Sequence, residues 1–538
     1  MPLSLSSNFE PIDQHLPIYQ DFLEDLQGNI LNGHGRDHAV HIFLTFKPDK
    51  KTAVKTWISN FATVKIISAK SQLDASEEYK ISKTDAGLFA HFALSASGYD
   101  YLEVPKSKQP HGSNPQNRPD TVPDPTGDPA PFYADSFQQG MKSRQAVLLD
   151  PSVEQWEKGF KDTIDAVIIL AADNPADLAD AEIEVSKELI DLVAITAIET
   201  GLTLRRNETT VDGTDIQKEF GNVVEHFGYA DGVSQPVFLQ QKLKGVSSKH
   251  WQHPGAPLKL VLIDDPNGTP SVSFGSFLVF RKLEQNVKGF KTAEAKLVSL
   301  GLPKELGGAM VGRYEDGTPL VLQPGDGGWA ESTKPTIPND FNYSSDPDAL
   351  KCPFHAHIRK SNPRLESVGS FAESNEVELG HRIARRRITY GGPLSTSADL
   401  DELPTGGVGL LFMCYQSDIW EQFEFIQRLG CNNLNFLEPG RSDITKTPPN
   451  PNYDITGLDA VIGKQGDKFD PVIGKAPEPP QNWPTQWGKP TQKLTIEPEN
   501  QFGQFVTLKG GEYFFSPSIT FLRNLPKLTF AEPSEPES

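Results

Sequence analysis

Short apolar segments recur along the chain and are separated by long polar stretches. Each is rich in β-branched, aliphatic and aromatic side chains, a composition that favours β-strands. Segments with apolar positions at helical spacing follow three of them. The expected strands cover residues 39–46 (AVHIFLTF), 165–172 (DAVIILAA), 276–283 (SFLVFRKL) and 408–416 (VGLLFMCYQ), and the expected helices cover residues 178–197, 286–300 and 417–429.

The expected helix at 417–429 carries an apolar stripe. Ile419, Phe423 and Ile426 recur at i, i+4 and i+7, so they share one face of the helix. Ser417 is the expected N-cap, with Asp418 in the first turn.

Strand-then-helix units in both halves of the chain predict an α+β protein. The chain has 538 residues, which is long for one ordinary core and indicates two domains or one large composite domain. Residues 246–257 are the expected link between the two halves. The stretches 105–131 and 323–341 are rich in proline and glycine and too long for simple turns, so we expect pocket walls, lids or poorly ordered insertions.

Composition excludes several classes of partner. The net charge of −20 would repel nucleic acid and anionic membrane surfaces. The three cysteines do not have the spacing of a disulfide framework or a zinc site. The N-terminal residues lack the pattern of a signal peptide, and no run of about 18 apolar residues is present to span a membrane. A cytoplasmic location is therefore expected.

The stretch KCPFHAHIRKSNPR (351–364) contains two histidines one residue apart. A His-x-His metal clamp needs both rings on one side, which a strand provides and a helix does not. Pro353 suits the first turn of a helix, so we expect residues 354–361 to be helical, with His355 and His357 on opposite sides. A two-histidine zinc site is therefore disfavoured. One histidine suffices when the cofactor brings the other ligands, as haem does.

Two further motifs carry candidate chemistry. GYADGVSQP (228–236) places one carboxylate between glycines, where the backbone can approach a flat ligand closely. RRRITYGG (385–392) joins three arginines to an aromatic side chain and two glycines. Each is weak alone, because Asp-Gly is a common turn dipeptide and consecutive arginines are usually solvated.

Taken in order with GLLFMCYQSDIWEQFEFIQ (409–427), these motifs resemble those of the dye-decolourising peroxidases, the DyP-type haem peroxidases. The segment LQGNILNGHGRDHAVHIFL (26–44) also resembles the opening strand of that family and its approach. The resemblance runs from about residue 26 to residue 522, nearly the whole chain.

The resemblance implies a fold and a division of the chain. The fold would consist of two ferredoxin-like α+β halves with packed antiparallel sheets, like a dimeric α+β barrel, with long loop insertions. An N-terminal extension (1–25) would precede a half that carries the Gly-x-x-Asp-Gly motif (26–245). A half that carries the haem ligand (246–525) and an acidic tail (526–538) would follow.

The resemblance also implies the cofactor, haem b (iron protoporphyrin IX), and the groups on its two sides. The family's Ala-His-Ile-Arg-like context selects His357 as the axial ligand and leaves His355 as a bystander. The Gly-x-x-Asp-Gly motif gives Asp231 as the distal acid, with Gly232 beside the cofactor.

The distal arginine of the family precedes the motif's aromatic residue by five positions. Counting back from Tyr390 gives Arg385, with Arg386 as the alternative. Arg387 stands where many members have glycine, so the register of the three arginines is open.

Other expected contacts follow from the same resemblance. Leu410 and Phe412 match the apolar distal wall. Arg359 and Lys360, close to His357 in sequence, are candidates to bind the haem propionates.

A carboxylate orients the axial histidine in this family, through the second ring nitrogen. The segment LDAVIG points to Asp459, and Glu421 and Glu424 remain alternatives.

The implied function is a peroxidase that uses hydrogen peroxide to oxidise bulky dyes and phenolic or other aromatic substrates in one-electron steps. Asp231 would move the peroxide proton, and Arg385 would stabilise negative charge. The alternative is a non-peroxidase haem protein: a carrier, a sensor or a deferrochelatase-like enzyme. Both a monomer and a homo-oligomer are compatible with the sequence.

Overall fold

The computed structural model describes residues 3–5, 8, 10–83, 85–111, 135–206, 223–230, 234–243, 254–327, 337–368, 374–395, 397, 399–437, 456–464, 481–490, 494–497 and 501–528. Most of the expected link at 246–257 and of the acidic tail lies outside these residues, as do the central parts of both proline- and glycine-rich stretches.

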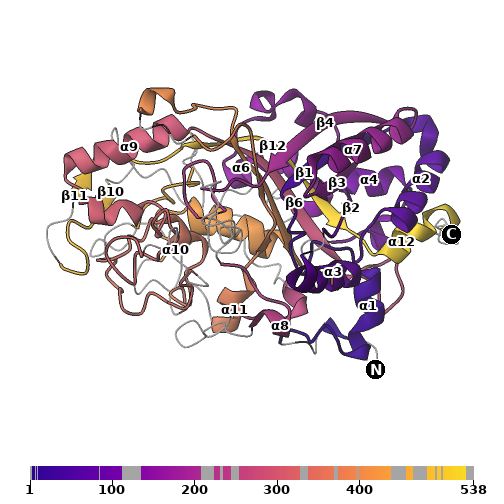
Figure 1. Cartoon of the computed structure of the whole chain (residues 1–538), viewed down its shortest axis with the longest axis horizontal. Helices are drawn as coiled ribbons and strands as arrows, with labels where there is room; N and C mark the ends of the chain where they lie inside the picture. The colour runs from indigo at the N-terminus through magenta and orange to yellow at the C-terminus, as the bar shows by residue number, and fades with distance from the viewer. Residues whose placement is uncertain are drawn as a thin grey trace, which may run out of the picture.

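Eight antiparallel strands close into a barrel at the centre of the molecule (Figure 1). Around the barrel they follow the order β6-β12-β2-β3-β1-β4-β8-β9, and β9 pairs back onto β6. Their bounds are β1 His38–Phe46, β2 Phe89–Leu94, β3 Ala166–Ala172, β4 Val193–Leu202, β6 Phe274–Gln285, β8 Ile388–Tyr390, β9 Gly409–Gln416 and β12 Val506–Ser516. Strands β5 (Ile263–Asp264) and β7 (Ala384–Arg385) extend the sheet, and β10 (Gln481–Trp483) pairs with β11 (Leu494–Ile496) apart from it.

Two narrow seams join the strands of the N-terminal half to those of the C-terminal half. Strand β4 pairs with β8 at Leu202 and Thr389, and β12 pairs with β2 at Phe515 and Leu94. The pairings within each half are far longer, such as β1 with β3 and β6 with β9. The barrel is therefore built from two four-stranded groups.

Aromatic side chains fill the barrel interior. Phe43 of β1 lies 4.7 Å from Phe280 of β6 and 6.3 Å from Phe514 of β12, measured between ring centroids. Because β1 pairs with neither strand, these contacts cross the interior. Burial of such large apolar rings stabilises the closed barrel.

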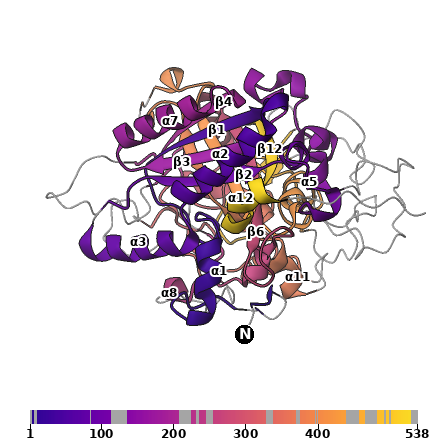
Figure 2. The ribbon, with the colours of Figure 1, turned by 90° about the vertical axis from the view of Figure 1, so that its right-hand side faces the viewer.

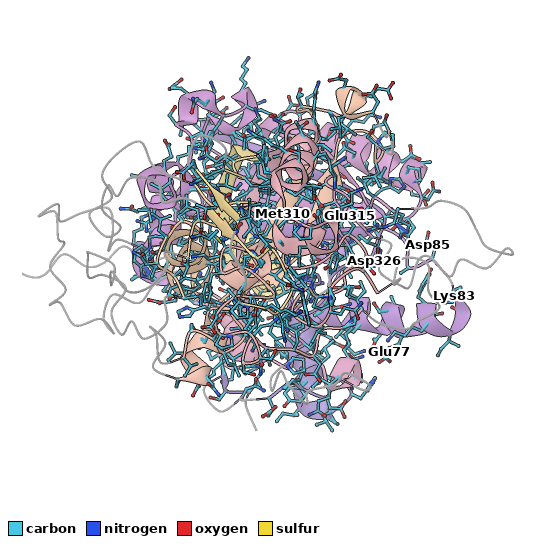
Figure 3. All side chains as sticks on the ribbon, turned by 90° about the vertical axis from the view of Figure 1, so that its left-hand side faces the viewer. Glu77, Lys83, Asp85, Met310, Glu315 and Asp326 are labelled. Atoms are coloured by element: carbon cyan, nitrogen blue, oxygen red, sulfur yellow. The ribbon has the colours of Figure 1, made fainter. Side chains whose placement is uncertain are left out.

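Helices cover the outside of the N-terminal strands (Figure 2). Trp57 of α2 packs against Phe92 of β2, α7 contacts β1 and β3, and α12 packs on α2. Helix α3 lies to one side, and Figure 3 shows Lys83, its C-cap residue, at the far end. The helices of the N-terminal half are α1 Gln20–Asp25, α2 Lys51–Val64, α3 Ala69–Ser82, α4 Ala96–Tyr101, α5 Ser136–Gln139, α6 Gln145–Leu148 and α7 Pro175–Leu189, and α12 Ile519–Asn524 follows the last strand.

Shorter helices and long loops surround the C-terminal strands. They include α8 Gln240–Leu243, α9 Val287–Leu300, α10 His357–Ser361, α11 Asn375–Gly380 and two π-helical segments, Ile419–Glu424 and Ile426–Cys431. No helix among the described residues has the length and apolar content needed to cross a lipid bilayer.

The α+β class and the four strands expected from the apolar segments are confirmed, but two helix predictions need correction. The helix expected at 178–197 ends at Leu189, and β4 begins at Val193, because VAITAIETGL is rich in β-branched residues and pairs along β1. In the π-helical segment the N-cap is Asp418, whose side chain accepts from the Glu421 amide, and not Ser417.

Candidate active site

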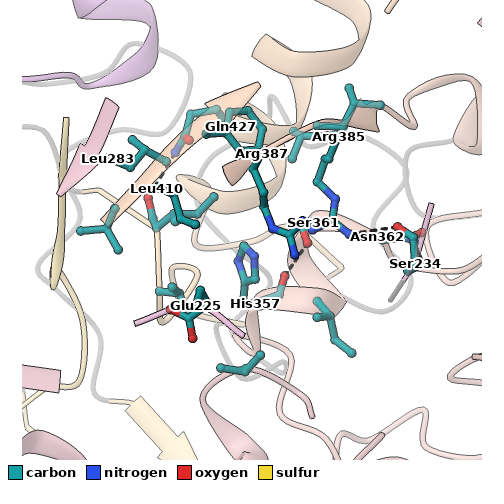
Figure 4. Close-up of a pocket in the computed structure, with 18 of the residues that line it drawn as sticks. Glu225, Ser234, Leu283, His357, Ser361, Asn362, Arg385, Arg387, Leu410 and Gln427 are labelled. Atoms are coloured by element: carbon teal, nitrogen blue, oxygen red, sulfur yellow. Dashed lines mark hydrogen bonds between the residues drawn. The ribbon is translucent and has the colours of Figure 1, made fainter. Parts of the chain in front are cut away.

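A cavity lies between the outer face of the barrel and the α10 side of the C-terminal half (Figure 4). Residues of each strand that face it are two apart, as expected when alternate side chains share one face. Residues of these strands that face the other way, such as Phe280, Leu411 and Met413, are buried in the core. The strand residues that line the cavity are Arg281, Leu283 and Gln285 of β6, Leu410 and Phe412 of β9, Val506 and Leu508 of β12, and Arg385 of β7.

His357 opens helix α10 and points into this cavity (Figure 4). Its side chain is 25% exposed, whereas that of Asp459 is fully buried. Nδ1 of His357 donates to Oδ2 of Asp459 over 2.8 Å. With the proton held on Nδ1, the Nε2 lone pair is left to bind a metal ion.

Asp459 is itself fixed by the backbone. Its Oδ1 accepts from the amides of Val461 at 2.8 Å and Ile462 at 2.9 Å. Burial alone would raise the pKa of Asp459, but the charge and hydrogen bond of His357 and these two amides hold it below the ordinary value. The carboxylate is therefore an anionic partner for the imidazole at neutral pH.

Neither alternative carboxylate reaches His357. Glu424 is buried in an ion pair with Arg144, 2.7 Å away. Glu421 lines a separate groove near α11. The structure therefore brings together His357 and Asp459 and separates both glutamates from them.

His355 faces away from the cavity, toward the apolar cluster that contains Trp483. Its ring packs edge-on against Trp483, with centroids 4.3 Å apart, and burial lowers its pKa to about 3. Its carbonyl accepts from Ala460, and its ring bonds to the Thr456 backbone. His355 thus holds the segment that carries Asp459.

The helix expected over residues 354–361 begins only at His357. Ala356 is extended, and the amides of His357 and Ile358 donate to the carbonyls of Met310 and Val311 instead of to the preceding turn. The two rings therefore diverge for a different reason from the one predicted, namely a bend at Ala356.

The three consecutive arginines point alternately to opposite sides, as side chains do along an extended chain. Arg385 and Arg387 line the cavity, whereas Arg386 turns away and donates to the carbonyls of Asn29 and Ile30. Arg385 donates from Nη2 to the Ser234 carbonyl over 2.9 Å, which ties it to the segment after the Gly-x-x-Asp-Gly motif. Arg386 is thereby placed outside the site.

Asp231 and Gly232 lie outside the described residues. Their neighbours Ala230 and Ser234 line the cavity, as do Leu410 and Phe412.

The prediction for Arg359 and Lys360 is wrong, because both side chains are buried away from the cavity. Arg359 pairs with Asp346 and Glu366. Nζ of Lys360 donates to the Asn433 and Phe436 carbonyls and to the Thr456 hydroxyl. These contacts support the loops around α10 and leave neither group available for a ligand in the cavity.

The sequence reading missed several polar groups in the lining. Glu225 is held by the amides of Phe227 and Tyr229, and burial raises its pKa. Arg313 and Arg364 both donate to the Asn339 side chain. Arg364 stands inside KCPFHAHIRKSNPR, so its closeness to His357 in the sequence could have marked it as a candidate lining residue.

A buried charge cluster forms one corner of the cavity. Asp150 bonds to Arg281 over 2.5 and 2.8 Å and also to Lys464, and both cations line the cavity. Burial alone would raise the pKa of Asp150, but the charges of Arg281 and Lys464 hold it below its ordinary value.

We expect Asp150→Asn to lower the free energy of unfolding by about 3–5 kcal/mol at neutral pH, because two buried cations lose their counter-charge. The folded pKa lies below the unfolded value of about 3.9, so this contribution is complete above that pH and disappears as the pH falls through the folded value. Urea unfolding at about pH 7 and about pH 3 should show a smaller difference from wild type at the lower pH.

The matched control for this prediction is Asp180→Asn, at an exposed position on α7. It should leave stability unchanged at both pH values. An Asp150→Asn effect of the same size in acid would contradict the assignment of an ionised Asp150.

No protein-family model matches the chain. The multifunctional dye peroxidase DyP2 from an Amycolatopsis species is 38% identical over 521 residues, which cover 94% of this chain and 96% of that protein. The chain belongs to the dye-decolourising peroxidase family.

Solved structures agree with this membership. A DyP-type peroxidase from Anabaena superposes with a TM-score of 0.77 at 37% identity and covers 96% of this chain and 97% of that one. A deferrochelatase from Yersinia pestis matches over only 87 residues, 16% of this chain.

Membership of the dye-decolourising peroxidase family establishes the general reaction. Dye-decolourising peroxidases are haem enzymes that use hydrogen peroxide, so the chain is an oxidoreductase that takes peroxide and a reducing substrate.

Proposed function

We propose that this dye-decolourising peroxidase binds haem b with His357 as the axial ligand and acts on hydrogen peroxide with Asp231 and Arg385. The observation that carries the proposal is the hydrogen bond of His357 to the buried Asp459, with His357 and Arg385 both lining one cavity (Figure 4).

The lining fits iron protoporphyrin IX in polarity and charge. The macrocycle needs apolar walls, one axial base and cations for its two carboxylates. Leu283, Leu410 and Phe412 offer apolar surface on the barrel side, and His357 offers the base. Among the described lining residues Glu225 is the one carboxylate, against the cations Arg281, Arg313, Arg364, Arg382, Arg385, Arg387 and Lys464.

Arg313 and Arg364 are the best candidates to bind the propionates. Both are buried, and burial lowers their pKa values to about 9 and about 10. The hydrogen bonds of Arg313 go to the neutral Gly317 and Pro338 carbonyls and the Asn339 side chain. A carboxylate in the cavity would add a negatively charged partner to the neutral partners of Arg313.

We expect Arg364→Gln to weaken haem binding by roughly 10- to 100-fold, since a hydrogen bond to a charged group contributes about 1.5–3 kcal/mol. Titration of the apoprotein with haem, followed by absorbance, measures this. Arg359→Gln is the control: it removes a buried ion pair and lowers stability, but the folded variant should bind haem as tightly as wild type. Equal weakening in both variants would contradict the assignment.

Bound haem would supply an iron centre that takes two oxidising equivalents from peroxide and passes them on singly. Asp231 would accept the first peroxide proton and return it to the departing oxygen. Its ordinary pKa of about 3.9 keeps it ionised in acid, where histidine would be protonated. Arg385, anchored by the Ser234 carbonyl, would stabilise the negative charge of the peroxide anion.

The reducing substrates proposed for this chain are bulky dyes and phenolic or other aromatic compounds, as the name of the dye peroxidase DyP2 suggests. Neither nucleic acid nor a membrane is proposed as a partner, since the net charge of −20 would repel both. A cytoplasmic monomer or homo-oligomer is the proposed form.

The fold supports a finer proposal, two ferredoxin-like halves at residues 26–245 and 246–525 between the N-terminal extension (1–25) and the tail (526–538). Strand order β2-β3-β1-β4 in the first half corresponds to β8-β9-β6-β12 in the second, since each is the second, third, first and fourth strand of its half in chain order. In each, a helix follows the first and the third strand: α2 and α7, then α9 and the π-helical segments.

A haem titration of the purified apoprotein tests the proposed cofactor. We expect one haem per chain and a Soret absorption band. Zinc would leave the protein colourless, and a protein that binds no haem would contradict the proposal.

A further inference from the structure

A tyrosine and a histidine meet inside the barrel, on the side of the sheet opposite the cavity. The hydroxyl of Tyr415 on β9 lies 3.1 Å from Nε2 of His91 on β2. Strands β9 and β2 are not neighbours in the sheet, so the contact crosses the barrel interior. Both side chains are fully buried.

The surroundings of His91 decide which nitrogen carries the proton. Nδ1 lies 3.1 Å from the Gly28 carbonyl, which can only accept, so Nδ1 is the protonated nitrogen. Nε2 is then an acceptor, and it faces Tyr415 and the Ser516 hydroxyl, 2.8 Å away. Burial lowers the pKa of His91 to about 3, so its ring is neutral and its lone pair is available. The Tyr415 hydroxyl is thus placed to donate a hydrogen bond to a neutral base, Nε2 of His91.

Tyr415 is close to the cavity through one layer of sheet. On β9, Leu410 and Phe412 face the cavity, whereas Tyr415 faces the interior. In the pairing of β7 with β9, Ala384 opposes Tyr415 and Arg385 opposes Cys414. Three strand residues span about 10 Å, so Tyr415 lies about that far along β9 from Phe412.

We propose that Tyr415 is an internal one-electron donor to the cofactor cavity, with His91 as the base that takes its proton. The inference rests on the proposed haem peroxidase function. Tyr415 would donate its electron after peroxide has reacted and while no reducing substrate is bound.

The proposed step balances in electrons and protons. Tyr415 gives one electron to the peroxide-oxidised cofactor and so consumes one of the two oxidising equivalents of a peroxide molecule. Its O–H bond breaks, the proton passes to Nε2 of His91, and a neutral phenoxyl radical remains beside an imidazolium. When a reducing substrate returns one electron, the proton moves back to the phenol oxygen.

Other buried tyrosines in the described part of the chain lack a histidine partner. Tyr229, which lines the cavity, donates instead to Glu294 over 2.8 Å, and Glu294 is paired with Lys291. The Tyr99 hydroxyl has no hydrogen-bond partner among the described residues. Tyr513 donates to Glu424 over 2.9 Å, but Glu424 neutralises the buried Arg144 and would leave it uncompensated if protonated. Oxidation of a phenol is easier when a hydrogen-bonded neutral base takes its proton in the same step. Tyr415 is therefore the favoured donor.

Electron paramagnetic resonance of the haem-loaded protein, frozen after one equivalent of peroxide without reducing substrate, tests the proposal. Wild type should give a tyrosyl signal that narrows when the protein carries ring-deuterated tyrosine. Tyr415→Phe should lose this signal, and the matched buried variant Tyr99→Phe should keep it. His91→Gln retains polarity but no base, and should slow appearance of the radical by about 100-fold.

A second measurement needs no cofactor. Nitrogen-15 NMR of histidine-labelled apoprotein should show His91 as a neutral ring protonated at Nδ1, and Tyr415→Phe should shift its Nε2 resonance. An Nε2-protonated ring would overturn the proposal.

The outcomes separate this proposal from the one on which it rests. A protein whose haem spectrum responds to peroxide, but whose tyrosyl signal survives in Tyr415→Phe or disappears in Tyr513→Phe, overturns the role of Tyr415 alone. A protein whose bound haem does not respond to peroxide overturns the peroxidase proposal as well.

Discussion

His357→Ala should abolish stable haem binding while leaving the fold intact. The side chain is partly exposed to the cavity, and its partner Asp459 keeps the hydrogen bonds from the Val461 and Ile462 amides, so the fold should persist with some loss of stability. Loss of an axial ligand removes the one covalent link between protein and iron. Haem retained after gel filtration, measured by absorbance per chain, should fall to background.

His355→Ala is the natural control, two positions away. Its ring packs on Trp483 outside the cavity, so the variant should lose about 1–3 kcal/mol of stability but keep its haem. Equal haem loss in the two variants would contradict the assignment of a single axial histidine.

Arg385→Leu should slow the reaction with hydrogen peroxide by about 10²–10³-fold, the range for loss of one preorganised charge or donor at a reacting oxygen. Asp231→Asn should slow it by about 10²–10⁴-fold, because the proton acceptor is lost. Both variants should keep haem bound, since neither residue is an axial ligand. Stopped-flow absorbance of the haem-loaded protein mixed with peroxide gives the rates.

Arg386→Leu provides the comparison for the arginine. Arg386 bonds to the Asn29 and Ile30 carbonyls and faces away from the cavity, so its loss should leave the peroxide reaction close to the wild-type rate. A slow Arg386→Leu and a normal Arg385→Leu would reverse the assignment.

The apolar strands were readable from the sequence because each is a compact run of β-branched and aromatic residues. Strand β4 was not, since VAITAIETGL directly follows the amphipathic pattern of α7 and lacks a turn signal between them. Its pairing with β1, a long-range contact, decides its conformation.

Much of the candidate site could also be predicted, because motif positions point to His357, Asp459 and Arg385. The side-chain directions of Arg359 and Lys360 could not be predicted from motif positions. Both are near His357 in sequence, but the direction of each side chain depends on Asp346, Glu366 and the loop carbonyls that α10 meets only in the folded chain. Closeness to His357 in the sequence places both residues near the site but does not determine which way their side chains point.

Arg313 illustrates the remaining gap. Nothing in its local sequence marks it, and its place in the cavity arises from the loop after α9 folding against Asn339. Its value as a carboxylate-binding group depends on burial and on neutral partners, which only the three-dimensional arrangement reveals.

The proposed function is tested most directly by peroxide-dependent oxidation of a bulky dye by the haem-loaded protein between about pH 3 and about pH 7. Dye oxidation should require both haem and peroxide and should persist in acid, where an ionised Asp231 can still accept a proton. A protein that binds haem yet oxidises no dye at any of these pH values would contradict the assignment of a dye-oxidising peroxidase.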